Sequence, residues 1–212
     1  MIDFNVISTG SKGNAVVINK SILIDCGVPW KSLLGVCWDL RLVLLTHIHG
    51  DHFNRSTVRK LAWERPALRF GCCEWMVAPL MECGVDKRRI DVIDSAHFTK
   101  YSPELSVYAD PLLHDVPNTA WHVYINGEKI LYATDTNSMD GIEAKGYDLY
   151  LIEANYSENE IVERIRRKQE NGEYCHEWDV LNNHLSREKA EDWLYKNMGP
   201  HSQYVFLHEH EE

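Results

Sequence analysis

Hydrophobic positions along the chain fall into short runs that predict a sheet-rich fold. Residues 3–8 alternate polar and apolar side chains, and a segment of turn-forming residues at 9–14 separates them from the apolar run 15–18. This pattern predicts a β-hairpin. The run Leu42–Leu45 is apolar throughout, which predicts a strand whose sheet is covered on both faces.

Further strands and helices follow in alternation after these runs. Strands are expected at 21–25, 68–71, 90–93, 105–109, 119–125, 129–133, 148–153 and 203–207. Helices are expected at 29–36, 54–64, 74–82, 158–170 and 186–197. Asn126-Gly127 joins two of the strands as a two-residue hairpin turn. The alternation predicts an α/β (α+β) fold, and the length of 212 residues suits a single domain spanning 1–212.

Composition places the chain among ordinary globular proteins. Hydrophobic residues make up 44% and charged residues 25%. The sequence has no apolar run of bilayer-spanning length and no basic-then-apolar leader, so we expect a cytoplasmic protein without a membrane partner. Its six cysteines lack the regular spacing of a disulfide framework and are expected to be reduced.

The formal net charge of -10 argues against a grip on nucleic acid that extends over the whole chain. It does not exclude a nuclease, because two divalent cations would add about four positive charges at one place on the surface.

The segment Thr46–His52 directly follows the apolar run at Leu42–Leu45 and has the form HxHxDH. Three imidazoles and one carboxylate within six positions match neither the helical nor the strand period of burial. The spacing therefore predicts a metal site formed by His47, His49, Asp51 and His52. The alternative is a solvated polar loop.

Four more residues suited to metal binding or acid–base chemistry lie at or near the ends of predicted strands. They are His114, Asp135, His184 and His208. Such positions often carry function, because the sheet fixes them while leaving them accessible. The last one is ambiguous, since His210 offers a second imidazole; we prefer His208 because it directly follows the strand at 203–207.

The order HxHxDH, His, Asp, His resembles the metallo-β-lactamase superfamily over essentially the whole chain. The resemblance implies a four-layer αββα sandwich with two divalent metal ions at one edge of its sheets, zinc or manganese with iron possible. It assigns His47, His49 and His114 to one metal, Asp51, His52 and His208 to the other, and Asp135 to both.

Further segments of the sequence resemble particular branches of this superfamily. Asn183–Ser186 and Phe206–His208 are similar to ribonuclease Z-like phosphodiesterases, in which the first histidine protonates the leaving oxygen or binds the phosphate. The turn Gly10–Asn14 resembles that of the YycJ (WalJ)-type exonucleases. The resemblance thus implies His184 and Asp51 as catalytic residues. The chain lacks the long insertion of the larger RNA-processing relatives and the glycine-rich arm of ribonuclease Z.

The expected function is that of a dinuclear-metal hydrolase, a phosphodiesterase or nuclease in which a metal-bridging hydroxide attacks the substrate. Its partner would be nucleic acid or another phosphodiester, and a homodimer is possible. Two alternatives stay open. One is hydrolysis of a cyclic phosphate, thioester or lactone at the same site, and the other is a non-catalytic metal-binding module.

Several other residues could support the predicted site or pack elsewhere. Asp25 could orient a ligand histidine or could be a turn residue, and Glu153 could support His184 or face solvent. His122 is expected to be packed rather than a ligand. The basic run at 164–168 could hold phosphates, although a solvated helix face balanced by glutamates is the favoured interpretation.

Overall fold

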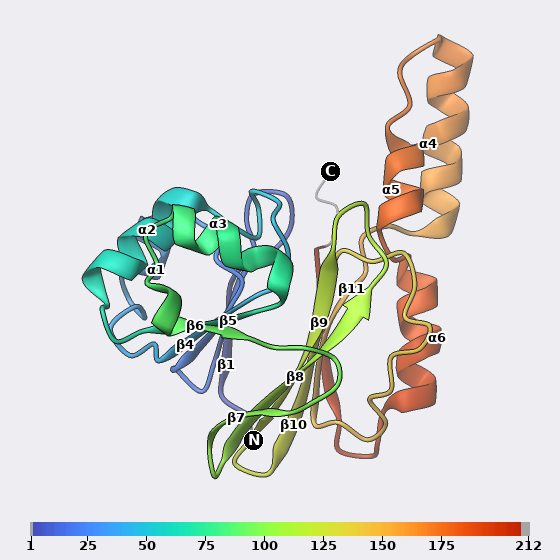
Figure 1. Ribbon diagram of the computed structural model, residues 1–212. Helices are drawn as coiled ribbons and strands as arrows, with labels where there is room; N and C mark the ends of the chain where they lie inside the picture. The colour runs from blue at the N-terminus through green and yellow to red at the C-terminus, as the bar shows by residue number, and fades with distance from the viewer. Residues whose placement is uncertain (1, 209–212) are drawn as a thin grey trace.

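The computed structural model describes residues 2–208 and shows two six-stranded sheets packed face to face (Figure 1). The first sheet contains β1 (Phe4–Ser8), β2 (Ala15–Ile18), β3 (Ile22–Ile24), β4 (Leu42–Leu45), β5 (Arg69–Cys72) and β6 (Ile90–Val92), in that order. The second contains, from edge to edge, β12 (Gln203–Leu207), β11 (Leu149–Glu153), β10 (Glu128–Ala133), β9 (Asn118–Ile125), β8 (Leu105–Leu112) and β7 (Thr99–Ser102).

Helices form the outer layers. The first sheet is covered by α1 (Trp30–Leu33), α2 (Arg55–Glu64) and α3 (Val77–Glu82), with the short 3₁₀ helices η1 (Glu74–Met76) and η2 (Lys87–Arg89) beside them. The second sheet is covered by α6 (Arg187–Asn197), while α4 (Glu158–Asn171) and α5 (Glu177–Asn183) project away from it (Figure 1). The expected αββα sandwich is confirmed.

The apolar strand β4 shows why the sequence requires four layers. Val43 and Leu45 pack into the core beneath the helices, whereas Leu42 and Leu44 pack into the core between the two sheets. Successive side chains of a strand point to opposite faces, so a strand without polar positions needs cover on both sides. Each covered side removes apolar surface from water, which stabilises the sandwich.

Strand direction decides where the loops gather. β3, β4 and β5 run parallel to one another, and so do β10, β11 and β12. β8 has the same direction as β10, because each pairs antiparallel with β9. The carboxyl ends of these strands therefore meet along one edge of the sandwich, which we call the site edge.

The cysteines are free thiols, as the composition predicts. The cysteines form no disulfide; five are buried and Cys175 is half-buried. Among residues 2–208, no helix combines the length and the apolar character that crossing a membrane requires.

The projecting arm, α4 with α5, has little core of its own. Ile161 and Ile165 pack with Tyr156 in a small cluster, and the basic run is engaged by neighbouring acids. Ion pairs join Arg164 to Glu160, Arg166 to Glu170 and Lys168 to Glu177. These contacts support the interpretation of the run as a solvated helix face rather than a phosphate-binding surface.

One of these ion pairs joins the two helices of the arm. Lys168 Nζ lies 2.6 Å from Glu177 Oε1. Burial raises the pKa of Glu177, but the hydrogen bonds from Lys168, from its own backbone N–H and from Cys175 together outweigh burial and lower the pKa from 4.5 to about 2. A depressed carboxyl pKa contributes stability that is present above about pH 4.5 and lost as the pH falls toward 2.

Glu177→Gln is therefore expected to lower the free energy of unfolding at pH 7 by about 1–3 kcal/mol, because Lys168 loses its charged partner. The deficit should shrink between pH 4.5 and 2, measured by denaturant unfolding at several pH values. Glu163→Gln on the exposed side of α4 is the control. If Glu177→Gln lowered the free energy of unfolding equally at pH 7 and at pH 3, the ion pair with Lys168 would not be the source of this stability.

Candidate metal centre

The predicted residues lie at or shortly after the carboxyl ends of strands, along the site edge. Asp25 follows β3, the segment 46–52 follows β4, and Asp135 follows β10 by two residues. His114 comes shortly after β8, and His208 comes directly after β12. Parallel strand ends thus bring together side chains that are up to 183 positions apart, from Asp25 to His208.

The HxHxDH loop is held against the backbone after β3. Cys26 N donates to His52 O at 2.9 Å, and Asn14 N donates to Asp51 O at 2.6 Å. Gly27 lies so close to this loop that a Cβ atom built on it would be 1.6 Å from Asp51 O. Only glycine permits this approach, so the sequence Cys26-Gly27 fixes where the loop can lie.

Gly27→Ala is expected to displace the loop and to weaken metal binding by about 10–100-fold, the range seen when support of metal ligands is lost. Isothermal titration with Zn²⁺ measures this loss. Gly35→Ala is the matched control, since a Cβ there meets no atom within 4 Å. Equal affinities of the two variants would show that the close approach does not position the ligands.

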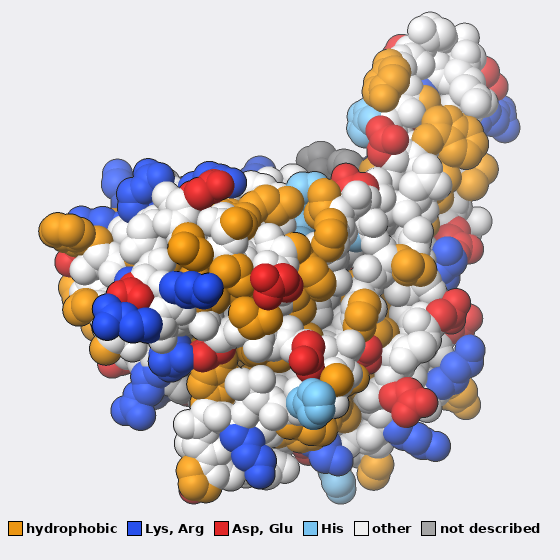
Figure 2. All heavy atoms as spheres, viewed as in Figure 1, with side chains coloured by type: hydrophobic (Ala, Val, Ile, Leu, Met, Phe, Trp, Pro, Cys, Tyr) orange, Lys and Arg blue, Asp and Glu red, His pale blue; other side chains and the backbone are white. Residues whose placement is uncertain are grey.

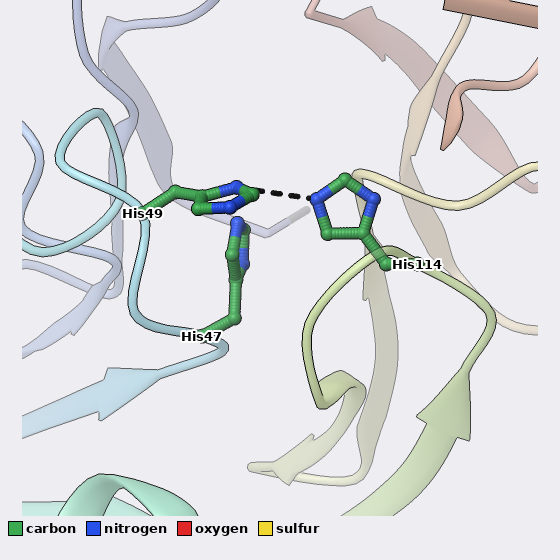
Figure 3. A group of neighbouring side chains, drawn as sticks. All are labelled: His47, His49 and His114. Atoms are coloured by element: carbon green, nitrogen blue, oxygen red, sulfur yellow. Dashed lines mark hydrogen bonds between the residues drawn. The ribbon is translucent and has the colours of Figure 1, made fainter. Parts of the chain in front are cut away.

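Three histidines form the first cluster. His47, His49 and His114 each offer a ring nitrogen within 4.8 Å of the other two, and Figure 3 shows their rings converging from the loop after β4 and the turn after β8. His49 Nδ1 lies 3.3 Å from His114 Nε2. His47 Nε2 is buried without a hydrogen-bond partner. A buried, unpaired imidazole nitrogen facing two others fits a metal ion, which would satisfy it.

The protonation states of these histidines also suit metal binding. Burial lowers the pKa of His47 to about 2, and the neighbouring His52 acts in the same direction. Burial also lowers the pKa of His114. Both imidazoles are therefore neutral near pH 7, which is the form that binds a metal ion.

The second cluster combines carboxylates with imidazoles. Asp51, His52 and His208 form one group within 4.8 Å, with His208 Nε2 3.4 Å from Asp51 Oδ2. Asp135 belongs to a group with His47 and His52 and also lies near His208. It therefore stands between the two clusters, where a bridging ligand would be needed. His210 lies outside the described residues, whereas His208 reaches this group.

Buried residues behind the second cluster fix its imidazoles. Asp25 Oδ2 lies 2.6 Å from His52 Nδ1, and the same carboxylate accepts hydrogen bonds from Thr46 and Tyr132. This leaves His52 Nε2 to face Asp135, 2.8 Å away. Asp25 is thus a positioning residue for His52, the first of the two roles considered for it. Asn155 Nδ2 donates to His208 O at 2.8 Å and lies 2.9 Å from His208 Nδ1, so Asn155 contacts both the backbone and the ring of His208.

His184 lies beside the second cluster without belonging to the predicted ligand set. Its Nδ1 is 2.5 Å from Glu153 Oε1, and its ring stacks on His208 with 5.1 Å between centroids. Burial alone would lower the pKa of His184, but the hydrogen bond and the charge of Glu153 raise it above the ordinary value. His184 can therefore hold a proton near neutral pH, oriented by a fully buried carboxylate.

Three of the site residues adopt a left-handed backbone. The φ angles are 58° at Asp25, 57° at Asp135 and 55° at His208. Each lies one or two residues after a strand end. This conformation is uncommon for residues other than glycine and costs free energy that the surrounding structure must supply.

The structure brings all seven predicted ligands together at the site edge, with His184 beside them. As expected, His122 is buried elsewhere, with its Nδ1 2.9 Å from Tyr147 Oη. Sequence reasoning missed the supporting roles of Tyr132, Thr46 and Asn155. Of these, Asn155 carried a usable signal, because it follows β11 by two residues.

An αββα sandwich with imidazoles and carboxylates gathered at the carboxyl ends of its strands defines a metal-dependent hydrolase. The model of the Beta-lactamase superfamily domain matches residues 20–208, so the chain belongs to that superfamily. Among curated proteins, none matches the sequence significantly. Family and clusters together indicate divalent metal ions as cofactors.

Solved structures share the fold at low sequence identity. The metallo-beta-lactamase fold protein YhfI from Bacillus subtilis superposes with a TM-score of 0.74 at 14% identity, covering 100% of this chain and 87% of YhfI. The short form of human tRNase Z (ELAC1) gives 0.70 at 15%, covering 99% and 93%. A diphosphatase from the PhnP family gives 0.67 at 14%, covering 99% and 87%. The resemblance to the metallo-β-lactamase superfamily is confirmed.

Proposed function

We propose that this protein is a dinuclear-metal phosphodiesterase that cleaves nucleic acid. The observation that carries the proposal is His184, an imidazole fixed by the buried carboxylate of Glu153 directly beside the clustered ligand groups. Cleavage of a nucleic-acid diester expels a sugar alkoxide, which is a poor leaving group and needs a proton. A tRNase Z and a PhnP-family diphosphatase with the same fold support this choice of chemistry.

The residues divide the work as follows. His47, His49 and His114 would hold one cation, Asp51, His52 and His208 the other, and Asp135 would contact both. When bound, two such cations make water nucleophilic near neutral pH and offset the negative charge that develops on the phosphate. Asp25 and Asn155 orient His52 and His208. His184 donates its proton to the leaving oxygen, and Glu153 keeps the imidazole in position and protonated.

The test begins with metal analysis of protein purified without chelator, for which we expect two divalent ions per chain. The loaded protein is then assayed on bis(p-nitrophenyl) phosphate, on labelled single- and double-stranded DNA and RNA, and on a thioester. Hydrolysis of the diesters that stops on adding EDTA and returns with Zn²⁺ or Mn²⁺ supports the proposal. Cleavage of the thioester alone would overturn it, and no hydrolysis by the loaded protein would indicate a binding module.

A further inference from the structure

Trp75 is an exposed aromatic residue beside the predicted ligands that the mechanism above does not use. It lies in η1, shortly after β5 ends at the site edge next to β4. Its indole Nε1 donates to Thr46 O at 3.3 Å, and Thr46 Oγ1 in turn lies 2.9 Å from His47 Nδ1. The indole is thus linked through Thr46 to His47 of the first cluster, and 37% of the surface of Trp75 is exposed.

A second exposed apolar residue stands on the facing sheet. Leu113 directly precedes His114 and is 63% exposed. The two sheets come close here, because Cys73, two residues before Trp75, packs in the core between the sheets, as does Ala109 of β8. Figure 2 shows hydrophobic side chains on both sides of the histidine surface at the upper edge of this face. Exposed apolar side chains therefore lie near the histidine cluster.

The negative net charge of the molecule leaves a role for such apolar side chains in binding nucleic acid. With a net charge of -10, the chain gains little from electrostatic attraction to a polyanion. Near the first cluster, Asp115 adds an exposed carboxylate 3.1 Å from His114 and 3.5 Å from His49. Binding of a nucleic acid therefore needs a contribution that does not depend on charge. Stacking of a base on an aromatic ring is such a contribution, and it accepts any base.

We propose that Trp75 is a stacking platform for the nucleobase next to the cleaved phosphate, so that the substrate is a single-stranded nucleic acid with unpaired bases. This inference rests on the proposed function. Each nucleotide places a planar base one backbone unit from its phosphate, and the indole is linked through Thr46 to His47 of the first cluster. The hydrogen bond to Thr46 holds the ring in one orientation, so little side-chain entropy is lost on stacking.

The first experiment compares two substrates in the metal-loaded enzyme. Trp75→Ala is expected to lower kcat/KM on a single-stranded oligonucleotide by about 10–100-fold more than on methyl p-nitrophenyl phosphate, which carries no base. Trp75→Phe keeps a ring but lacks the N–H donor, and should restore most of the oligonucleotide activity. Trp63→Ala on α2 is the matched control, because Trp63 is 81% exposed and lies outside the site. Melting temperatures report whether each variant is folded.

The second experiment removes the base instead of the indole. An oligonucleotide with one abasic residue beside the cleaved bond should lose about 10–100-fold in wild type and little further in Trp75→Ala, because the same contact is already missing. Equal abasic losses in both enzymes overturn the proposal. So do equal losses of Trp75→Ala on both substrates, or a Trp75→Phe variant as poor as Trp75→Ala, which show that Trp75 acts through Thr46. A wild-type enzyme that hydrolyses no nucleic acid refutes the proposed function itself, and is recognised before any variant is made.

Discussion

Asp135→Asn is expected to reduce kcat/KM on every substrate of this protein by at least about a thousandfold, because charge stabilisation by a bound cation is worth several kcal/mol. The carboxylate lies between the two clusters and is buried, so it has no replacement from solvent. Asparagine keeps the shape and tolerates the left-handed backbone at this position. The loss should therefore come from the charge and not from unfolding.

Metal content and kcat/KM are measured together for this variant. Asp140→Asn on an exposed turn is the control and should retain both. A thousandfold loss of activity accompanied by fewer bound ions assigns Asp135 to metal binding. Full activity with the wild-type metal content would refute the bridging position inferred from its neighbours.

His184→Ala is expected to have the second largest effect, and this effect should depend on the leaving group. Loss of a general acid costs about 10²–10⁴-fold when the departing oxygen is a sugar alkoxide. A p-nitrophenolate departs without a proton, so bis(p-nitrophenyl) phosphate should be hydrolysed at a rate much closer to that of wild type. The measurement is kcat on a labelled oligonucleotide and on the nitrophenyl diester.

The control for this experiment is His201→Ala, since His201 lies exposed in the loop after α6. Equal losses of the His184 variant on both substrates would mean that His184 binds the phosphate or supports the ligands. In that case the proton must come from elsewhere.

Much of the fold could be predicted because burial leaves a local pattern. The four apolar residues of β4 specify a strand covered on both faces, and the cap at Asn54 marks the start of α2 by accepting a hydrogen bond from Thr57 N. β7 and α5 were missed. β7 is an edge strand whose half-buried and exposed positions alternate, but Tyr101 is its one large apolar side chain, so the sequence shows no hydrophobic pattern there. α5 buries too few residues to show a helical period.

The ligand set could be predicted because HxHxDH is local, and the remaining ligands follow apolar strands. The residues that hold the ligands in position could not be predicted, because they reach the ligands through contacts between distant parts of the chain. The hydrogen bond from Tyr132 to Asp25 spans 107 positions, and nothing around either residue indicates its partner. Trp75 carries no signal of its own either, since an isolated tryptophan is usually part of a core. Only the meeting of β4 and β5 places it beside His47.

The left-handed conformations at Asp25, Asp135 and His208 commit part of the stability of this molecule to its site. Each costs about 1–3 kcal/mol. Glycine at Asp25 would relieve the backbone, but it would also leave Thr46, Tyr132 and His52 without their buried hydrogen-bond partner, which costs at least as much. Relieving the backbone there does not recover stability. Engineering a thermostable active form has to draw its gains from elsewhere, such as the sparsely packed arm of α4 and α5.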